Sequence, residues 1–127
     1  MKTQLFFRII LAGVAAVLLQ ACATTSSGPA GLAGTWTNSL GTVWTMRADG
    51  SFDVDLNKDG KRDAWGNCTF QGDMITIVGT GGKVPKGCMN TKGVYHYKRT
   101  GDNLHFTLVS DPCAKRKQNL ALDWTKK

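Results

Sequence analysis

The stretch TVWTMRADGSFDVDL, residues 42–56, decides the fold of this chain. Apolar and polar residues alternate on both sides of Asp49-Gly50, a pattern typical of two antiparallel strands joined by a tight loop. A two-residue loop would mix the faces, whereas a three-residue loop, 48–50, pairs Met46 with Phe52 and places Gly50 in the left-handed conformation. The three-residue loop therefore predicts one apolar face, made of Trp44, Met46, Phe52, Val54 and Leu56.

The same alternation recurs along the chain around Gly72-Asp73 and Gly101-Asp102. A two-residue turn at the first site aligns Cys68 with Ile77 and predicts that Cys68 is buried. The second turn places five residues on one inward face: Tyr95, Tyr97, Leu104, Phe106 and Leu108. With strands at 34–39 and 120–125, and a short helix over 113–119 capped by Asp111, we expect an all-β fold, an antiparallel meander of about eight strands closing into a small barrel.

The composition favours this fold and a basic surface. The chain has no glutamate and fifteen glycines, so turn formers outnumber helix formers. Sixteen lysines and arginines against nine acidic residues give a formal charge of +7. Such a surface favours anionic partners such as glycans or lipid headgroups, although it could serve solubility alone. Nucleic acid is not an expected partner, because the N-terminus, described next, predicts export to the envelope.

The N-terminus predicts export. Eleven apolar residues, 9–19, follow Lys2 and Arg8, a length that suits a signal peptide and is too short to span a bilayer. Leu19-Gln20-Ala21-Cys22 resembles the lipobox of bacterial lipoprotein signals. The resemblance implies a signal peptide over 1–21, lipid such as palmitate on Cys22, and residence in the bacterial cell envelope, at the outer membrane because Ala23 follows. An ordinary secretory signal cut near Ala23 is the alternative.

Small polar residues then predict a flexible tether over 22–31 before a single domain over 32–127. Gly34-Thr35-Trp36, at the start of the first expected strand, resembles the lipocalin signature. That resemblance implies a barrel whose closed end is plugged by Trp36, with a basic residue, Arg116 or else Lys115, stacked on the indole. It also implies a small apolar or amphipathic ligand inside the barrel, against Trp44, Met46, Phe52, Val54, Tyr95, Tyr97, Phe106 and Leu108. A barrel filled by these same side chains, with a structural role in the envelope, is the alternative.

An Asp-rich loop lies between two of the expected strands. Its oxygen ligands are spaced as at the start of an EF-hand loop, and the resemblance to shorter β-strand calcium loops predicts structural calcium on Asp55, Asn57, Asp59, Lys61 and Asp63. The missing glutamate at the twelfth position excludes a true EF-hand. Basic residues inside the loop favour the alternative, a polar hairpin loop without metal.

Three cysteines follow Cys22, so one disulfide and one free thiol are expected in an oxidising compartment. Cys88 and Cys113 lie in loops and are the predicted pair. Cys68 lies in mid-strand, and a Cys68–Cys88 pair is the alternative.

The motifs do not favour an enzyme, because the chain has no nucleophile elbow, no phosphate-binding glycine loop and no pair of glutamates. A binding protein is therefore expected, with no required cofactor. One alternative is a protein-interaction lipoprotein similar to lysozyme inhibitors, which the basic charge disfavours. Another is an envelope protein that contacts peptidoglycan or lipopolysaccharide through Lys83, Lys86, Lys115, Arg116 and Lys117.

Overall fold

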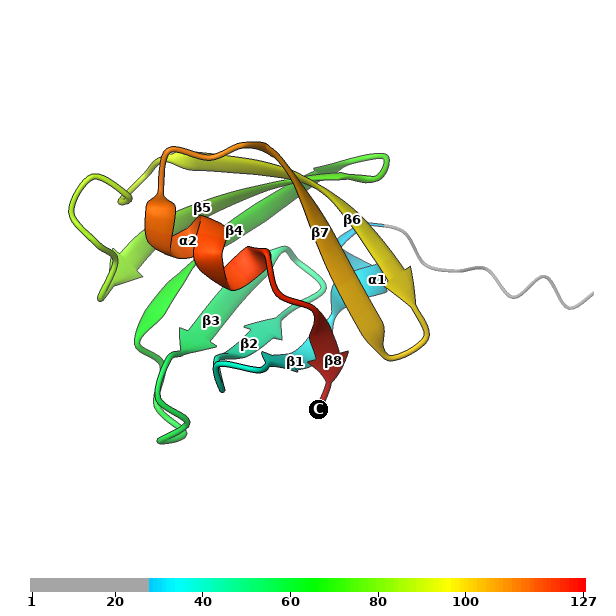
Figure 1. Cartoon of the computed structure of the whole chain (residues 1–127), viewed down its shortest axis with the longest axis horizontal. Coiled ribbons are helices and arrows are strands. Elements are labelled where there is room, and N and C mark those ends of the chain that lie inside the picture. The colour runs from blue at the N-terminus through cyan, green and yellow to red at the C-terminus, as the bar shows by residue number, and fades with distance from the viewer. Residues whose placement is uncertain (1–27) are drawn as a thin grey trace, which may run out of the picture.

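The computed structural model describes residues 28–127, and the predictions for the signal peptide, for Cys22 and for the first part of the tether lie outside these residues. Eight antiparallel strands wind into a closed barrel, in which each strand pairs with the next in sequence and the last pairs with the first (Figure 1). The predicted all-β barrel is confirmed.

The elements are short, as the frequent turn signals require. In chain order they are α1 (Pro29–Leu32), β1 (Gly34–Asn38), β2 (Val43–Met46), β3 (Ser51–Asp55), β4 (Ala64–Gln71), β5 (Met74–Gly82), β6 (Lys92–Thr100), β7 (Asn103–Ser110), α2 (Ala114–Leu120) and β8 (Trp124–Lys126).

The predicted registers are confirmed where short loops fix them. Met46 pairs with Phe52 across β2 and β3, and Cys68 pairs with Ile77 across β4 and β5. Gly50 has a φ of 89°, and a Cβ at this position would lie 2.5 Å from the Cys68 carbonyl oxygen. Only glycine therefore fits the β2–β3 loop, because both the backbone conformation and the space exclude a side chain.

Because the strands alternate in direction, their connections gather at two ends of the barrel. We call the end with the tight turns 47–50, 72–73 and 101–102 the closed end, and the end with the longer segments 39–42, 56–63, 83–91 and 111–123 the open end. Figure 1 shows the closed end on the right and the open end on the left.

Helix α2 completes the wall of the open half. β8 is only three residues long and pairs with β7 only at Asn103 and Leu104, near the closed end. α2 spans the remaining gap between β7 and β1, and its Leu120 is buried in the core. The side chain of Asn119 accepts hydrogen bonds from Asn38 Nδ2 (3.1 Å) and Thr42 Oγ1 (2.8 Å), which hold the end of α2 against the β1–β2 loop.

The closed half is filled by side chains. The largest fully buried residues are Trp36, Tyr95, Leu32, Ile75 and Leu104. Leu32 belongs to α1, and its carbonyl accepts a hydrogen bond of 2.9 Å from Trp36 Nε1. Burying these side chains provides most of the driving force for folding, at about 1.5–3 kcal/mol for each large apolar residue.

The prediction of a tether over 22–31 is wrong for its last four residues. α1 begins at Pro29, and Gly31 is buried with Leu32. Gly28 N donates to Tyr97 Oη (3.1 Å), and Tyr97 Oη donates to the Gly72 carbonyl (3.3 Å) in a closed-end turn. Residues 28–31 therefore belong to the folded unit, and the chain joins it at the closed end.

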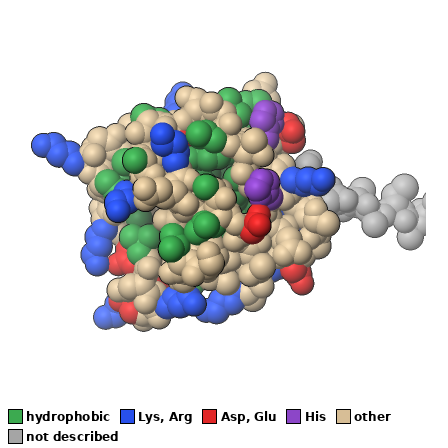
Figure 2. Space-filling model, viewed as in Figure 1, with side chains coloured by type: hydrophobic (Ala, Val, Ile, Leu, Met, Phe, Trp, Pro, Cys, Tyr) green, Lys and Arg blue, Asp and Glu red, His purple; other side chains and the backbone are tan. Residues whose placement is uncertain are grey.

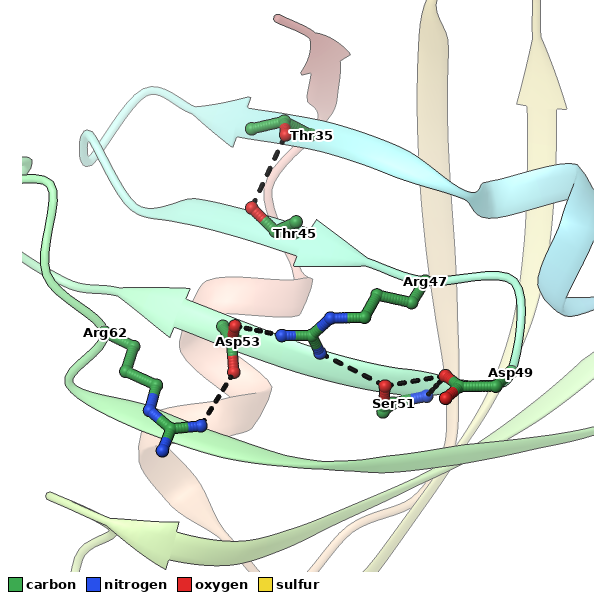
Figure 3. Close-up of polar contacts among 7 residues, drawn as sticks. All are labelled: Thr35, Thr45, Arg47, Asp49, Ser51, Asp53 and Arg62. Carbon is green, nitrogen blue, oxygen red and sulfur yellow. Dashed lines mark hydrogen bonds and ion pairs between the residues drawn. The ribbon is translucent and has the colours of Figure 1, made fainter.

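The outer face of β1, β2 and β3 is polar, as the alternation predicts. Asp53 on β3 lies between Arg47 and Arg62 and forms an ion pair with each, while Thr35 and Thr45 face one another across β1 and β2 (Figure 3). Both arginines are about half exposed, so these pairs add little to stability.

Candidate functional site

A cavity of about 380 Å³ opens at the open end of the barrel. Its inner wall is apolar and aromatic, formed by Trp44, Phe52, Ile77, Leu120 and Trp124. Its mouth lies between α2, the β3–β4 loop and residues 83–85 of the β5–β6 loop. The volume falls in the lower range of small-molecule sites. The open end of the barrel therefore has a cavity that reaches solvent, whereas the closed end is filled by side chains.

The structure brings some of the predicted interior residues to this cavity. Trp44, Phe52 and Val54 line it. Met46, Tyr95 and Phe106 are buried in the core without lining it, and Tyr97 lies at the closed end, against the ring of Phe70.

The prediction that Leu108 faces the interior is wrong, because its side chain is 51% exposed. It borders a separate hollow on the outside, between β7 and α2. The β6–β7 register is as predicted, since Leu108 pairs with Tyr95, but β8 is too short to cover β7 beyond Leu104, and Leu108 is therefore left exposed.

The inner wall is held by contacts between aromatic rings. Trp44 packs against Phe52 at 5.8 Å, Phe106 at 5.6 Å and Trp124 at 5.6 Å between ring centroids. Such edge and tilted contacts contribute about 0.5–1.5 kcal/mol each beyond burial. Trp44 and Trp124 also keep buried indole N–H groups with no hydrogen-bond partner among the described residues. The wall is thus close-packed and mostly apolar, and the two indole N–H groups are its unsatisfied donors.

The charged side chains that line the cavity are all basic: Lys83, Lys115 and Arg116. Lys83 Nζ lies 3.0 Å from Asp63 Oδ1, and this carboxylate is itself buried. Arg116 is only 13% exposed and is held by Asp111. Lys115 is exposed and forms no ion pair with any residue between 28 and 127.

The prediction that Arg116 stacks on Trp36 is wrong. Arg116 instead forms a buried ion pair with Asp111. Its Nε and Nη2 donate to the two carboxylate oxygens, both at 2.7 Å. The same carboxylate accepts from Tyr95 Oη at 2.5 Å and from the Cys113 N–H at 2.8 Å. The prediction failed because Asp111 does not cap the helix: α2 starts at Ala114, and Asp111 points into the wall instead.

These four donors determine the ionisation of the cluster. Burial alone would raise the pKa of Asp111, but the hydrogen bonds from Arg116, Tyr95 and the Cys113 N–H outweigh it and lower the pKa below its ordinary value. Burial, together with the hydrogen bond to Asp111, raises the pKa of Tyr95. The cluster therefore holds one carboxylate and one guanidinium, and it fixes the start of α2 at the cavity mouth.

Trp36 is covered by other cations at the closed end. The guanidinium carbon of Arg99 lies 5.1 Å from the indole centroid, and Lys126 Nζ lies 5.9 Å from it. Arg99 Nη1 also donates to the Gly31 carbonyl at 2.6 Å. Lys126 ends the last strand, Arg99 lies on β6, and the sequence analysis predicted neither of them as the cation over Trp36. The place of Arg99 near the rim of the same face was the available signal.

Cys88 and Cys113 form the predicted disulfide, with their Cα atoms 5.0 Å apart. Both residues line the cavity, so the bond ties the β5–β6 loop to the start of α2 across the mouth. Cys68 is a free thiol in the described part of the chain, and burial raises its pKa. It is an unreactive core residue, as expected.

The Asp-rich loop does not present its oxygens together. Asp63, the last of the five predicted ligands, accepts the Leu56 N–H at 2.8 Å and Lys83 Nζ at 3.0 Å. Asp55 accepts the N–H groups of Asn57 and Gly60 within the loop. No three His, Cys, Asp or Glu side chains in the described chain are grouped to hold a metal ion. Two of the five predicted ligands thus already have partners within the protein, and the calcium site stays a prediction.

Comparison with known proteins does not add to this picture: the chain matches no protein-family model, no curated protein and no solved structure. Within residues 28–127, neither helix is long and apolar enough to cross a membrane.

Proposed function

We propose that this protein is a lipocalin-like binding protein of the bacterial cell envelope, which holds a small apolar or amphipathic ligand in the open half of its barrel. The observation that carries the proposal is the cavity of about 380 Å³ with its aromatic inner wall. An apolar wall favours a ligand by removing apolar surface from water, at about 25 cal/mol per Å².

Binding rather than catalysis fits the chemistry of the lining. Among the described residues that line the cavity there is no histidine, aspartate or glutamate, and both of its cysteines are in the disulfide. The wall can enclose a ligand, but it offers no carboxylate, imidazole or free thiol as a general base or nucleophile. No cofactor is part of the proposal.

A displacement experiment tests the ligand proposal. An apolar fluorophore should bind to the purified protein, and a long-chain amphiphile should displace it. Val54→Trp, which fills the cavity wall, should weaken binding at least tenfold. Val109→Trp is the matched control, because Val109 is exposed and lies outside the cavity lining. Absence of fluorophore binding, or equal loss in both variants, would contradict the proposal.

We also propose that lipid on Cys22 anchors the protein, at the outer membrane. The support is the lipobox-like stretch 19–22 after an apolar run of signal-peptide length. More than one acyl chain would be needed for stable anchoring. Labelled palmitate should enter the wild-type protein and should not enter Cys22→Ser. Incorporation into neither protein would refute the anchor without affecting the cavity.

A further inference from the structure

The charged side chains that line the cavity mouth are all basic. Lys83, Lys115 and Arg116 are its charged lining residues, and no acidic side chain among the described residues joins them. Because Asp63 and Asp111 pair with two of these cations, one positive charge at the rim is left unpaired, and it favours an amphiphile with an anionic head over one with a cationic head.

Two of the three cations are already neutralised by the protein. Lys83 is paired with Asp63 at 3.0 Å, and the hydrogen bond and charge of Asp63 raise the pKa of Lys83, so it stays protonated. Arg116 donates hydrogen bonds to Asp111 from Nε and Nη2, and Nη2 also donates to Thr91 Oγ1 at 3.3 Å. Arg116 cannot turn to a ligand without leaving the buried Asp111 carboxylate without its cation, which is costly. Lys83 keeps N–H groups free, but its positive charge is already balanced by Asp63.

Lys115 differs from both. It lies on α2, its side chain is exposed, and it has no ion-pair or hydrogen-bond partner among residues 28–127. Its backbone is nevertheless fixed, since the disulfide at Cys113 and the Asp111–Arg116 pair hold the segment on both sides of it. The Lys115 ammonium can therefore contact the head of a ligand at the rim without breaking any ion pair or hydrogen bond within the described protein.

We propose that the ligand is an amphiphile with one anionic head, a carboxylate or a phosphate, whose head pairs with Lys115 and whose tail lies against Trp44, Phe52 and Trp124. This inference rests on the binding function proposed above and names the ligand class. The head remains at the mouth, in water, because the inner wall carries no charged side chain to offset the cost of burying an anion. The tail displaces water from the aromatic wall.

Four probes with the same twelve-carbon tail test the inference: dodecanoate, dodecyl phosphate, dodecanol and dodecylamine. Their affinities are measured by fluorophore displacement. We expect the two anions to bind about tenfold tighter than the alcohol and the amine weakest, with the gap narrowing as salt is added. The two anions distinguish a carboxylate ligand from a phosphate ligand, and acetate and inorganic phosphate should fail to displace the fluorophore.

Two variants on the same helix identify the residue. Lys115→Met should reduce the affinity for dodecanoate and dodecyl phosphate to that for dodecanol, about tenfold, and should leave dodecanol binding unchanged. Lys117→Met removes the same charge from α2, but Lys117 borders the outer hollow between β7 and α2, so it should have little effect.

The outcomes separate the two proposals. If dodecanol and dodecanoate bind equally to the wild-type protein, the anionic head is refuted while the binding function stands. If Lys115→Met and Lys117→Met lower the affinity for the two anions equally, the affinity depends on the net charge of the surface, and the specific role of Lys115 is refuted. If none of the four probes displaces the fluorophore, both proposals fail.

Discussion

Replacement of Arg116 by methionine should destabilise the barrel strongly. The Asp111 side chain has no solvent-accessible surface, and Arg116 supplies two of the four hydrogen bonds to its carboxylate. In Arg116→Met the carboxylate would keep only Tyr95 Oη and the Cys113 N–H. Removing one partner of a buried pair costs about 3–5 kcal/mol, which for a domain of this size lowers Tm by roughly 15–30 °C.

Urea unfolding, followed by tryptophan fluorescence, measures this cost. Two further variants make the result interpretable. Arg47→Met removes an arginine from an exposed pair on the outer face and should cost less than about 1 kcal/mol. The double variant Asp111→Leu with Arg116→Met removes both buried charges and should cost much less than the sum of the two single variants.

Two results would refute the reasoning. One is a loss in Arg116→Met no larger than that in Arg47→Met, which would mean that the Asp111 site is not buried as described. The other is additivity in the double variant, which would mean that the two charges do not interact. If Arg116→Met does not fold, Tyr95→Phe tests the same carboxylate with one lost hydrogen bond, at about 1.5–3 kcal/mol.

Four other predictions follow from the same structure. The double variant Cys88→Ser with Cys113→Ser should lower the free energy of unfolding by about 3.5 kcal/mol, the loop-closure entropy expected for a sequence separation of 25. Urea unfolding without reductant measures this loss, and Cys68→Ala, which keeps the disulfide, is the control. Arg99→Met should cost about 0.5–2 kcal/mol through its stack on Trp36, whereas Lys98→Met, its neighbour on β6, should be neutral; equal unfolding midpoints would contradict this. Because the pKa of Asp111 is lowered in the folded state, its ionised carboxylate contributes fully to the stability of the fold above pH 3.8, and this contribution is lost as the pH falls through the lowered pKa. Acid unfolding, followed by circular dichroism, should therefore be less steep below pH 3.8 for Asp111→Asn than for the wild type. Millimolar calcium should leave Tm unchanged within about 1 °C, since Asp63 is occupied by Lys83 and the Leu56 N–H; a rise that Asp55→Asn abolishes would restore the calcium site.

The strand pairing could be predicted from the sequence because short loops leave few alternatives. A glycine at position 50 and alternation on both sides fix the β2–β3 register, since a shift of one residue would turn Trp44 and Phe52 outward. The disulfide could be predicted for a similar local reason, because Cys68 falls in mid-strand and leaves Cys88 and Cys113 in loops.

The charged contacts could not be predicted, because they depend on barrel closure. Arg99 meets Trp36 across 63 positions of sequence, and only the pairing of β8 with β1 and β7 brings those strands to one end. Arg116 follows Asp111 by five residues, yet no pattern around Asp111 indicated that the folded chain would bury this aspartate instead of using it as a helix cap. The cavity at the open end likewise depends on the distance between α2 and the strands, which the alternation of apolar and polar residues does not predict.

The place where the chain enters the barrel has a consequence for orientation. Gly28 lies at the closed end, bonded to Tyr97, whereas the cavity opens at the other end. Six residue steps separate Cys22 from Gly28, at most about 20 Å of extended chain. If Cys22 is held in a bilayer, the closed end is the part of the barrel that is tied close to that leaflet, and the cavity opens at the end that is not tied. A ligand would then reach the cavity from the aqueous side more easily than from the bilayer that would hold Cys22.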